Sequence, residues 1–271
     1  MENYYVLRHY KGLCYSRSTS LISQCAPFEH RHCHDAYELI YVLQGQGKYI
    51  VEGAEYTIHP HALFFMRPYE YHCALPSPGG TYERIVLRFE EELLPATVRR
   101  LSLLHEKRGN YFSVFASTTP LHAAFETLGG TTALLEDGQE EDAEALLHAT
   151  LAQIMLLLSV KKPEAPSIPT SPTVLRVIEY LNAHLQEELS LDALAKEFFI
   201  SKYHLCRLFR QQTGASILIY FNAKRLALAK QMIAHGESAT SVALHLGFRD
   251  YSTFYRAYRK QMGESPVRKI K

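Results

Sequence analysis

Residues 207–216 read RLFRQQTGAS, and residues 256–265 read RAYRKQMGES. Both stretches follow the pattern Arg-x-aromatic-Arg-x-Gln-x-Gly-x-Ser. At about 100° per residue, each segment before the glycine forms a helix with arginines on one face and apolar residues on the other. A polar face alone is typical of an ordinary surface helix, but its duplication in one chain favours two DNA-reading units.

Charge divides the chain in the same way. Residues 173–271 carry 15 Lys and Arg against 8 Asp and Glu, whereas residues 1–172 carry 14 against 20. The net charge of +1 therefore combines a basic C-terminal third with an acidic remainder. This asymmetry is typical of a nucleic-acid-binding module attached to a part that does not bind nucleic acid.

Each copy of the pattern is expected to be the second helix of a helix-turn-helix. Ser190 and Ser201 are suitable N-caps for the two helices of the first unit, and Asp250 is a suitable N-cap in the second. The residues predicted to face the core are Leu205, Leu208 and Phe209, and then Phe254, Ala257 and Tyr258. The residues predicted to face outward are Tyr203, Cys206, Arg207 and Arg210, and then Ser252, Tyr255, Arg256 and Arg259, with Tyr251 near the edge.

The outward basic residues suit two kinds of DNA contact. An arginine can donate two hydrogen bonds to guanine O6 and N7, so Arg207 and Arg256 are predicted to read bases. Lys202, Arg210 and Arg259 are predicted to contact phosphates, which position a protein without reading sequence.

Residues 190–266 closely resemble the DNA-binding domain of the AraC/XylS family of bacterial transcription regulators. The resemblance rests on LSLDALAKEFFISKYHLCRLFRQQTGAS, on a helix with Arg225, Leu226 and Ala229, and on SVALHLGFRDYSTFYRAYRKQMGESP. It implies two helix-turn-helix units joined by one helix, roughly 217–235, with recognition helices in successive major grooves. By position it implies base contacts from Tyr203, Cys206, Arg207, Tyr251, Ser252 and Arg256. Cys206 departs from the family pattern, which usually has a longer polar side chain there.

The N-terminal half has a different pattern. Short apolar or alternating runs separated by Gly and Pro predict the strands of a small all-β sandwich or barrel. These runs cover residues 39–43, 48–52, 56–59, 63–66 and 84–89. Apolar residues at three- and four-residue intervals between 146 and 158 predict an amphipathic helix, whose stripe either packs on the barrel or forms a dimer seam.

The predicted fold class is α+β in two domains. Residues 1–160 form a cupin-like sensor and dimerisation domain, with a β-barrel over about 1–92 and trailing helices over about 93–160. Residues 161–172 (KKPEAPSIPTSP) contain four prolines and form a semi-rigid, exposed linker. Residues 173–271 form an all-α domain of two helix-turn-helix units joined by a long helix.

Polar side chains of the N-terminal half predict a site inside the barrel. On a strand His32 and His34 point to the same face, where Glu38 and His72 can join them. The spacing His32-x-His34-x3-Glu38-x6-Gly45 resembles the first motif of cupin barrels. The second motif is degraded: Glu70 stands in place of the usual glycine, and His72 lies one residue closer than expected.

Three readings of these four side chains stay open. They could hold a divalent transition metal, since three imidazole nitrogens and a carboxylate oxygen suit zinc, iron, nickel or manganese. They could instead line a metal-free pocket for a small polar effector such as a sugar, or be remnants that hydrogen-bond at the barrel mouth. Tyr41 is a further effector-binding candidate, and Arg8, Tyr37 and Arg88 could serve the same pocket.

The cysteines and the apolar segments indicate in which cellular compartment the protein is expected. No C-x-x-C occurs, and the irregular spacing indicates neither a disulfide framework nor a cysteine zinc cluster. The five cysteines are Cys14, Cys25, Cys33, Cys73 and Cys206. The N-terminus lacks an apolar signal segment, and no apolar run approaches the roughly 20 residues that span a bilayer. We therefore expect a soluble, cytoplasmic protein without a membrane partner.

These features predict a sequence-specific transcription regulator, not an enzyme. We expect it to bind a double-stranded DNA operator, to form a homodimer, and to respond to a small effector in the barrel. Two alternatives remain: a metal-dependent cupin enzyme with an accessory helical domain, and a constitutive DNA-binding regulator whose barrel serves only dimerisation. No hydrolytic triad, Walker loop or dinucleotide fingerprint supports another enzyme class, and no catalytic residue is assigned.

Overall fold

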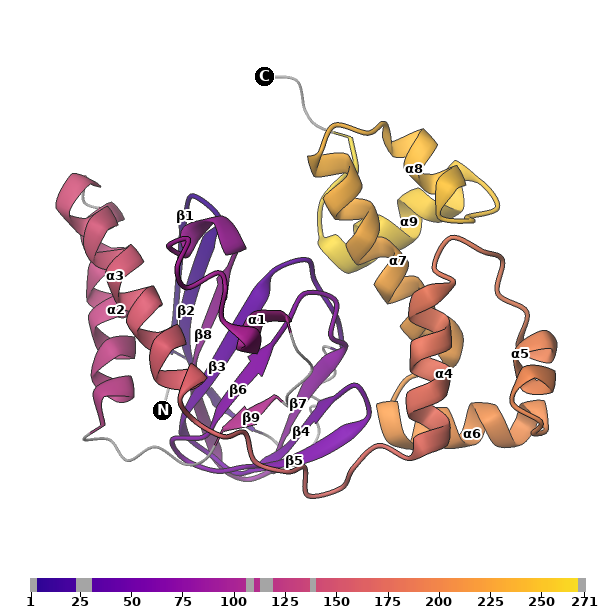
Figure 1. The fold of residues 1–271 in the computed structure, drawn as a ribbon, viewed down its shortest axis with the longest axis horizontal. Coiled ribbons are helices and arrows are strands. Elements are labelled where there is room, and N and C mark those ends of the chain that lie inside the picture. The colour runs from indigo at the N-terminus through magenta and orange to yellow at the C-terminus, as the bar shows by residue number, and fades with distance from the viewer. Residues whose placement is uncertain (1–3, 23–30, 106–109, 113–118, 137–139, 268–271) are drawn as a thin grey trace.

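The computed structural model describes residues 4–22, 31–105, 110–112, 119–136 and 140–267. Two parts are evident in it: a β-rich N-terminal part flanked by helices, and a helical C-terminal part (Figure 1). The predicted α+β fold class is confirmed. Cys25, which was counted among the cysteines, lies outside the described residues.

Two antiparallel sheets make up the described core of the N-terminal part. The larger has the strand order β1 (Tyr4–Tyr10), β2 (Leu13–Leu21), β8 (Thr81–Phe89), β3 (Tyr37–Gln44), β6 (Leu63–Met66) and β9 (Tyr111–Phe112). The smaller has the order β5 (Ala54–Ile58), β4 (Gly47–Val51) and β7 (His72–Pro76). Between the sheets lies an apolar core that includes Val42, Tyr49 and Phe64, all nearly inaccessible to solvent. The five strands expected from the sequence are present, with ends shifted by up to three residues.

The sequence prediction missed the β1–β2 hairpin and β7. A two-residue turn joins β1 to β2, with positive φ at Lys11 (32°) and Gly12 (82°). Positive φ at both central residues matches the right-handed twist of a hairpin, and Gly12 adopts it without strain. The K-G dipeptide was therefore a usable signal for this hairpin.

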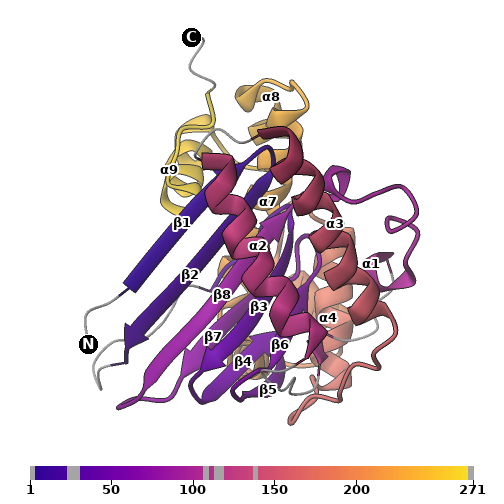
Figure 2. The ribbon, with the colours of Figure 1, turned by 90° about the vertical axis from the view of Figure 1, so that its left-hand side faces the viewer.

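Helices α2 (Pro120–Glu136) and α3 (Glu140–Ser159) cover the outer face of the larger sheet (Figure 2). Leu147, Leu151 and Ile154 of α3 are fully buried in one core with sheet residues such as Leu39 and Leu87. The apolar stripe of this helix therefore packs on the sheet of its own chain. Shorter helical elements precede α2, namely η1 (Glu91–Leu93) and α1 (Ser102–His105).

Between residues 172 and 267 the C-terminal part contains six helices. They are α4 (Pro172–Ala183), α5 (Leu191–Glu197), α6 (Lys202–Thr213), α7 (Ile217–Ala234), α8 (Ala239–His245) and α9 (Tyr251–Met262). One apolar core lies among α4, α5, α6 and the start of α7, and a second lies among the end of α7, α8 and α9. Helix α7 thus contributes to both cores and joins two helix-turn-helix units. Within the described residues no helix is long and apolar enough to cross a membrane.

The connection between the two parts differs in its last residues from the expected semi-rigid, exposed linker. Residues 161–166 are mostly exposed, as predicted, but Ile168 forms an antiparallel bridge with Glu55 of β5, and Thr170 is buried. The Thr170 hydroxyl donates to the Glu52 carbonyl at 3.0 Å. The last residues of the linker are therefore attached to the edge of the smaller sheet, because their backbone groups pair with β5 where the proline-rich composition alone indicated exposure.

Candidate nucleic-acid interface and buried histidine cluster

The two candidate recognition helices, α6 and α9, begin and end in the same way. The Ser201 side chain accepts a hydrogen bond from the backbone N–H of His204, and the Asp250 carboxylate accepts one from that of Thr253. Each helix ends at a glycine in the left-handed conformation, Gly214 with φ of 73° and Gly263 with φ of 75°. Capping at both ends fixes the length of each helix and with it the position of the arginines.

The inward and outward faces follow the predicted pattern. Leu205, Phe209, Phe254 and Tyr258 are buried, and Leu208 and Ala257 are half-buried. The predicted outward residues that are exposed are Lys202, Tyr203, Arg207, Arg210, Ser252, Arg256 and Arg259, while Cys206, Tyr251 and Tyr255 are half-buried. On α6 an open groove of about 490 Å³ is lined by Tyr203, Cys206, Arg207, Arg210 and Gln211.

Arg225 on α7 has a structural position that the sequence analysis did not foresee. Its guanidinium donates to the carbonyls of Leu185, Glu187 and Gly247 and lies over the Phe221 ring. Burial lowers the pKa of Arg225 to about 10. Because one side chain bonds the loops before α5 and before α9, it fixes the two units relative to α7.

The histidine cluster lies at one end of the space between the sheets. His32, His34, Glu38 and His72 each offer one ligand atom, and these atoms all lie within 4.8 Å of one another. The Nε2 atom of His72 is 2.8 Å from Glu38 Oε2, and that of His34 is 3.4 Å from the same oxygen. The structure thus brings together all four residues that the sequence grouped.

Backbone carbonyls orient two of these imidazoles. His34 Nδ1 is 2.9 Å from the Ala36 carbonyl, and His72 Nδ1 is 2.7 Å from the Glu70 carbonyl. A carbonyl oxygen only accepts, so Nδ1 carries the proton in both rings and Nε2 faces Glu38. Such a second contact is the usual way in which proteins orient metal-binding histidines.

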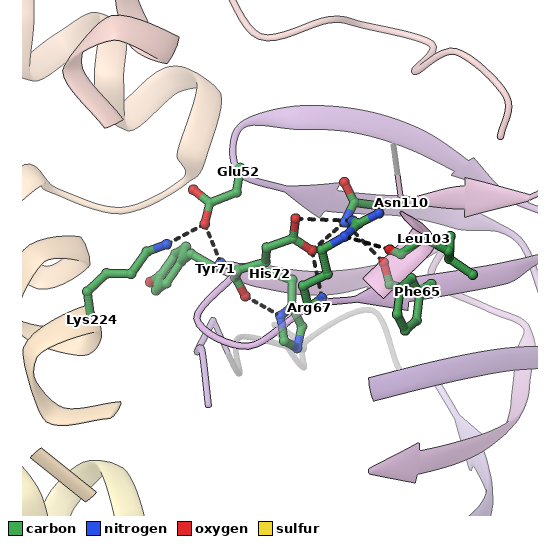
Figure 3. A network of polar contacts seen from close by, with 9 residues as sticks. Glu52, Phe65, Arg67, Tyr71, His72, Leu103, Asn110 and Lys224 are labelled. Atoms are coloured by element: carbon green, nitrogen blue, oxygen red, sulfur yellow. Dashed lines mark hydrogen bonds and ion pairs between the residues drawn. The ribbon is translucent and has the colours of Figure 1, made fainter. Parts of the chain in front are cut away.

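Glu70, which replaces the glycine of the cupin motif, holds the turn that positions His72. Its carboxylate accepts hydrogen bonds from the backbone N–H of Arg67 and from Asn110, and Figure 3 labels these two partners. The Arg67 side chain in turn donates to the Leu103 carbonyl. The departure from the cupin pattern therefore has a structural role, and His72 reaches the cluster despite the shorter spacing.

Electrostatics favour a charged Glu38. Burial opposes ionisation, but His34 and His72 outweigh it and hold the pKa of the Glu38 carboxyl well below its ordinary value. Burial likewise opposes charge on His72, but the Glu38 carboxylate raises the pKa of this imidazole above its ordinary value. Arg88 contacts the other oxygen of Glu38 at 3.1 Å. The cluster is thus arranged around a buried anion.

Tyr41 does not join the cluster. It lies an odd number of residues from Glu38 on β3, so its side chain points to the opposite face of the sheet. There its hydroxyl lies 2.9 Å from His61 Nδ1 and 3.1 Å from His122 Nδ1, and its ring stacks on Phe125. Tyr37 has the same parity and donates to Glu91. Arg8 donates to the Gly129 carbonyl, so Arg88 alone of the secondary candidates reaches the cluster.

The sequence analysis missed a set of contacts between the two parts of the chain. Glu52, in the β4–β5 turn with φ of 48°, accepts hydrogen bonds from Tyr220 and Lys224 of α7 and from the Tyr71 backbone. Figure 3 shows the contacts with Lys224 and Tyr71. The Lys224 side chain is only 3% exposed. Its charge is thus buried against a carboxylate of the other part, which fixes α7 on the smaller sheet.

A large cavity lies between the N-terminal part and the end of α7. It has a volume of about 940 Å³, and its lining includes His34, Tyr69, Arg88, Glu90 and Lys230. His34 belongs to both the cluster and the cavity wall. The cavity therefore adjoins the cluster at His34.

The fold and the two exposed arginine faces define a DNA-binding transcription regulator. Comparison with known proteins agrees: residues 18–155 match the family model of the AraC-like ligand binding domain, and residues 194–269 match that of a helix-turn-helix domain. The chain belongs to the AraC family of regulators.

Its relatives include HTH-type transcriptional activators named RhaS. The one from Escherichia coli strain SMS-3-5 is 26% identical over 239 residues, covering 87% of this chain and 85% of the relative. The one from Klebsiella pneumoniae strain 342 is 27% identical over 240 residues, with the same coverage. Among solved structures, wild-type ToxT from Vibrio cholerae strain SCE256, with an unsaturated fatty acid bound, aligns with a TM-score of 0.47 and 12% identity over 98% of this chain and 95% of that one.

Proposed function

We propose that α6 and α9 read one operator from adjacent major grooves and that an effector bound in the N-terminal part controls this binding. The observation that carries the proposal is the exposure of Arg207 and Arg256 at equivalent places on two helices with corresponding caps. Arginine at such a place can recognise guanine through two hydrogen bonds.

The spacing of the two units supports binding to consecutive grooves. Helix α7 has 18 residues, which at 1.5 Å per residue gives a spacer of about 27 Å. Successive major grooves lie about 34 Å apart, a distance of the same order. Because Arg225 bonds loops of both units, they would meet the DNA as one body.

The remaining basic residues would contact phosphates. Arg210 and Arg259 follow the base-reading arginines by one turn and are exposed. Lys202 pairs with Asp192 at 2.9 Å, so a phosphate would have to compete with that carboxylate. We therefore expect Lys202 to contribute less to binding than Arg210 or Arg259.

The effector is proposed to bind at the histidine cluster and the adjoining cavity. Both are polar, and the cavity wall carries Arg88 and Lys230 beside Glu90, which suits a small polar molecule or an ion. The chain is proposed to regulate rather than to catalyse, because residues 18–155 match an AraC-like ligand binding domain and residues 194–269 match a helix-turn-helix domain. Leu146 and Leu156 of α3 remain 43% and 49% exposed, and we propose that this face pairs two copies of the chain.

The decisive experiment isolates an operator and measures its binding. Duplexes selected from a random library by the purified chain would be titrated at several salt concentrations by fluorescence anisotropy. We expect the affinity for the selected sequence to exceed that for random DNA by at least about a thousandfold and to fall steeply with salt. Binding that did not distinguish the two sequences would contradict the proposed function.

A further inference from the structure

Two short segments lie side by side at the junction of the two parts. His32 and His72 form an antiparallel bridge, with N–H to carbonyl distances of 3.1 and 2.9 Å. The Tyr69 N–H donates to the His34 carbonyl at 2.7 Å, which extends the pairing. One β-bridge and one further backbone hydrogen bond therefore hold residues 31–35 against residues 69–72, and we call this pair of segments the junction ladder. Beside the bridge, neighbouring side chains point to opposite faces.

The even-numbered residues of the junction ladder form the cluster. His32, His34 and His72 point to Glu38 in the space between the sheets. The imidazole centroids of His32 and His72 are 4.5 Å apart, and those of His34 and His72 are 5.3 Å apart. His72 and Glu38 are almost fully buried.

The odd-numbered residues contact the DNA-binding part. Cys33 and Tyr71 are buried in the core of the first helix-turn-helix unit, and the Tyr71 ring lies 4.9 Å from that of Tyr220. The Tyr69 hydroxyl donates to Gln231 of α7, and Asp35 accepts from Lys230 of α7 at 3.1 Å. One face of the ladder thus meets the cluster, and the other face meets α7.

The ligand atoms at the centre of the cluster face one another and are shielded from solvent. Glu38 Oε2 and the Nε2 atoms of His34 and His72 are buried and make no hydrogen bond of good geometry. His72 Nε2 and Glu38 Oε2 lie 2.8 Å apart, so a proton or a metal ion must lie between them.

A metal ion satisfies all three atoms at once. Three imidazole nitrogens and one carboxylate oxygen form the donor set that zinc and other first-row divalent metals prefer. His34 also lies on the cavity wall.

We propose that a divalent transition-metal ion binds between His32, His34, Glu38 and His72, and that its binding fixes the junction ladder on α7. This inference names the effector class of the regulator and its path to the DNA-binding part, and so it rests on the proposed function. Binding of the ion restrains the even-numbered side chains. The odd-numbered ones belong to the same two backbones, so their contacts with α7 are restrained with them.

The first test measures metal binding to the full chain, purified without a histidine tag and freed of metal with a chelator. Zn²⁺, Ni²⁺, Mn²⁺ and, without oxygen, Fe²⁺ would be added separately and measured by elemental analysis after desalting and by titration calorimetry. We expect about one ion per chain for at least one of these metals. Binding of none of them would overturn the proposal.

Matched variants assign the site. His34→Ala removes one ligand and is expected to weaken metal binding by at least about tenfold. His59→Ala is the control, because His59 is an exposed histidine away from the cluster. Glu38→Gln provides a second ligand variant that keeps the shape of the side chain. Equal metal binding by the wild type and both ligand variants would contradict the site.

The second test follows the path to α7 by amide hydrogen exchange. Metal is expected to slow exchange in residues 31–35, 69–72 and 217–234. Asp35→Asn removes the charge that pairs with Lys230; we expect it to keep metal binding and to reduce the protection gained by α7. If metal binding left amide exchange in α7 unchanged, the proposed effect of the metal on α7 would be wrong.

Binding of the selected operator by the metal-free chain separates the two proposals. A chain that bound its operator but no metal would refute only this inference. A chain that bound metal but did not distinguish the operator from random DNA would refute the proposed function instead.

Discussion

The two helix-turn-helix units share a sequence pattern, caps and an exposed arginine face, but their surroundings differ. The core of the first unit includes Cys33 and Tyr71 from the N-terminal part, whereas the core of the second consists of residues from α7 onward. The repeat therefore specifies the DNA-reading helix in both units. Among the described residues, only the first unit shares its core with the sensor part. Regulation through the junction ladder would reach the first unit directly and the second unit through α7.

The largest expected effect on stability comes from removing one buried phenylalanine from each unit. The two variants test whether only the first unit shares its core with the N-terminal part. Phe209 and Phe254 are both fully buried, and replacement by alanine is expected to lower the free energy of unfolding by about 3–5 kcal/mol in each case. Phe209→Ala should also speed amide exchange in residues 69–72, because Phe209 shares a core with Tyr71. Leu244→Ala, at a residue 67% exposed, is the control. If residues 69–72 exchanged equally fast in both phenylalanine variants, the first unit would not be coupled to the N-terminal part more closely than the second.

The buried ion pair between Glu52 and Lys224 tests how strongly the first unit is attached to the N-terminal part. Glu52→Gln leaves the Lys224 ammonium buried without its charged partner, and we expect a loss of about 3 kcal/mol in the free energy of unfolding. Adding Lys224→Met removes the uncompensated charge and should restore part of this stability. Chemical denaturation of the two variants measures both effects. A double variant no more stable than Glu52→Gln alone would show that the cost does not come from the buried charge.

The next comparison concerns DNA. Arg207→Ala and Arg256→Ala are each expected to weaken operator binding by about 1–3 kcal/mol and to relax preference at one base pair. Fluorescence anisotropy with operators substituted at single positions would locate that base pair. Arg210→Ala and Arg259→Ala are the controls, which should reduce the salt dependence more than the sequence preference. An equal loss on operator and random DNA would make Arg207 or Arg256 a phosphate contact.

The smallest effect concerns the caps. Ser201→Ala removes the acceptor for the His204 N–H and should cost about 1 kcal/mol of stability. Asp250→Ser keeps an acceptor at the corresponding place in the second unit, so it should cost less than Ser201→Ala. Thermal unfolding of the two variants measures the difference. A larger loss for Asp250→Ser would show that the bond from the Thr253 hydroxyl to the carboxylate, at 2.9 Å, outweighs the cap itself.

Local signals made the helical part predictable from the sequence. The caps at Ser190, Ser201 and Asp250 are observed, and the connecting helix ends within one residue of the expected position. Each of these features depends on residues only a few positions apart in the sequence. The repeated pattern makes such local signals visible twice. The sequence also grouped His32, His34, Glu38 and His72, because strand alternation and a known spacing bring them together.

Other features depend on contacts that no local pattern reveals. Tyr41 was placed with the cluster although its parity on β3 directs it to the opposite face. Glu52 and its hydrogen-bond partner Lys224 are 172 residues apart in the sequence, and Asp35 and its partner Lys230 are 195 residues apart. Glu52 and Asp35 each appear in the sequence as ordinary acidic residues near a turn. Their function as interdomain contacts follows only from the packing of α7 on the smaller sheet.

The attachment of the linker to β5 sets how the two halves can separate. With Ile168 and Thr170 bound to the sheet edge, the helical half remains tethered close to its docking surface even when the Glu52–Lys224 pair breaks. The effective concentration of one half around the other therefore stays high, and redocking is intramolecular. Separation of the two parts would therefore be an intramolecular step, and its equilibrium would not depend on protein concentration. Separately expressed halves would consequently reproduce this behaviour poorly, because they lack the tether that keeps the two surfaces together.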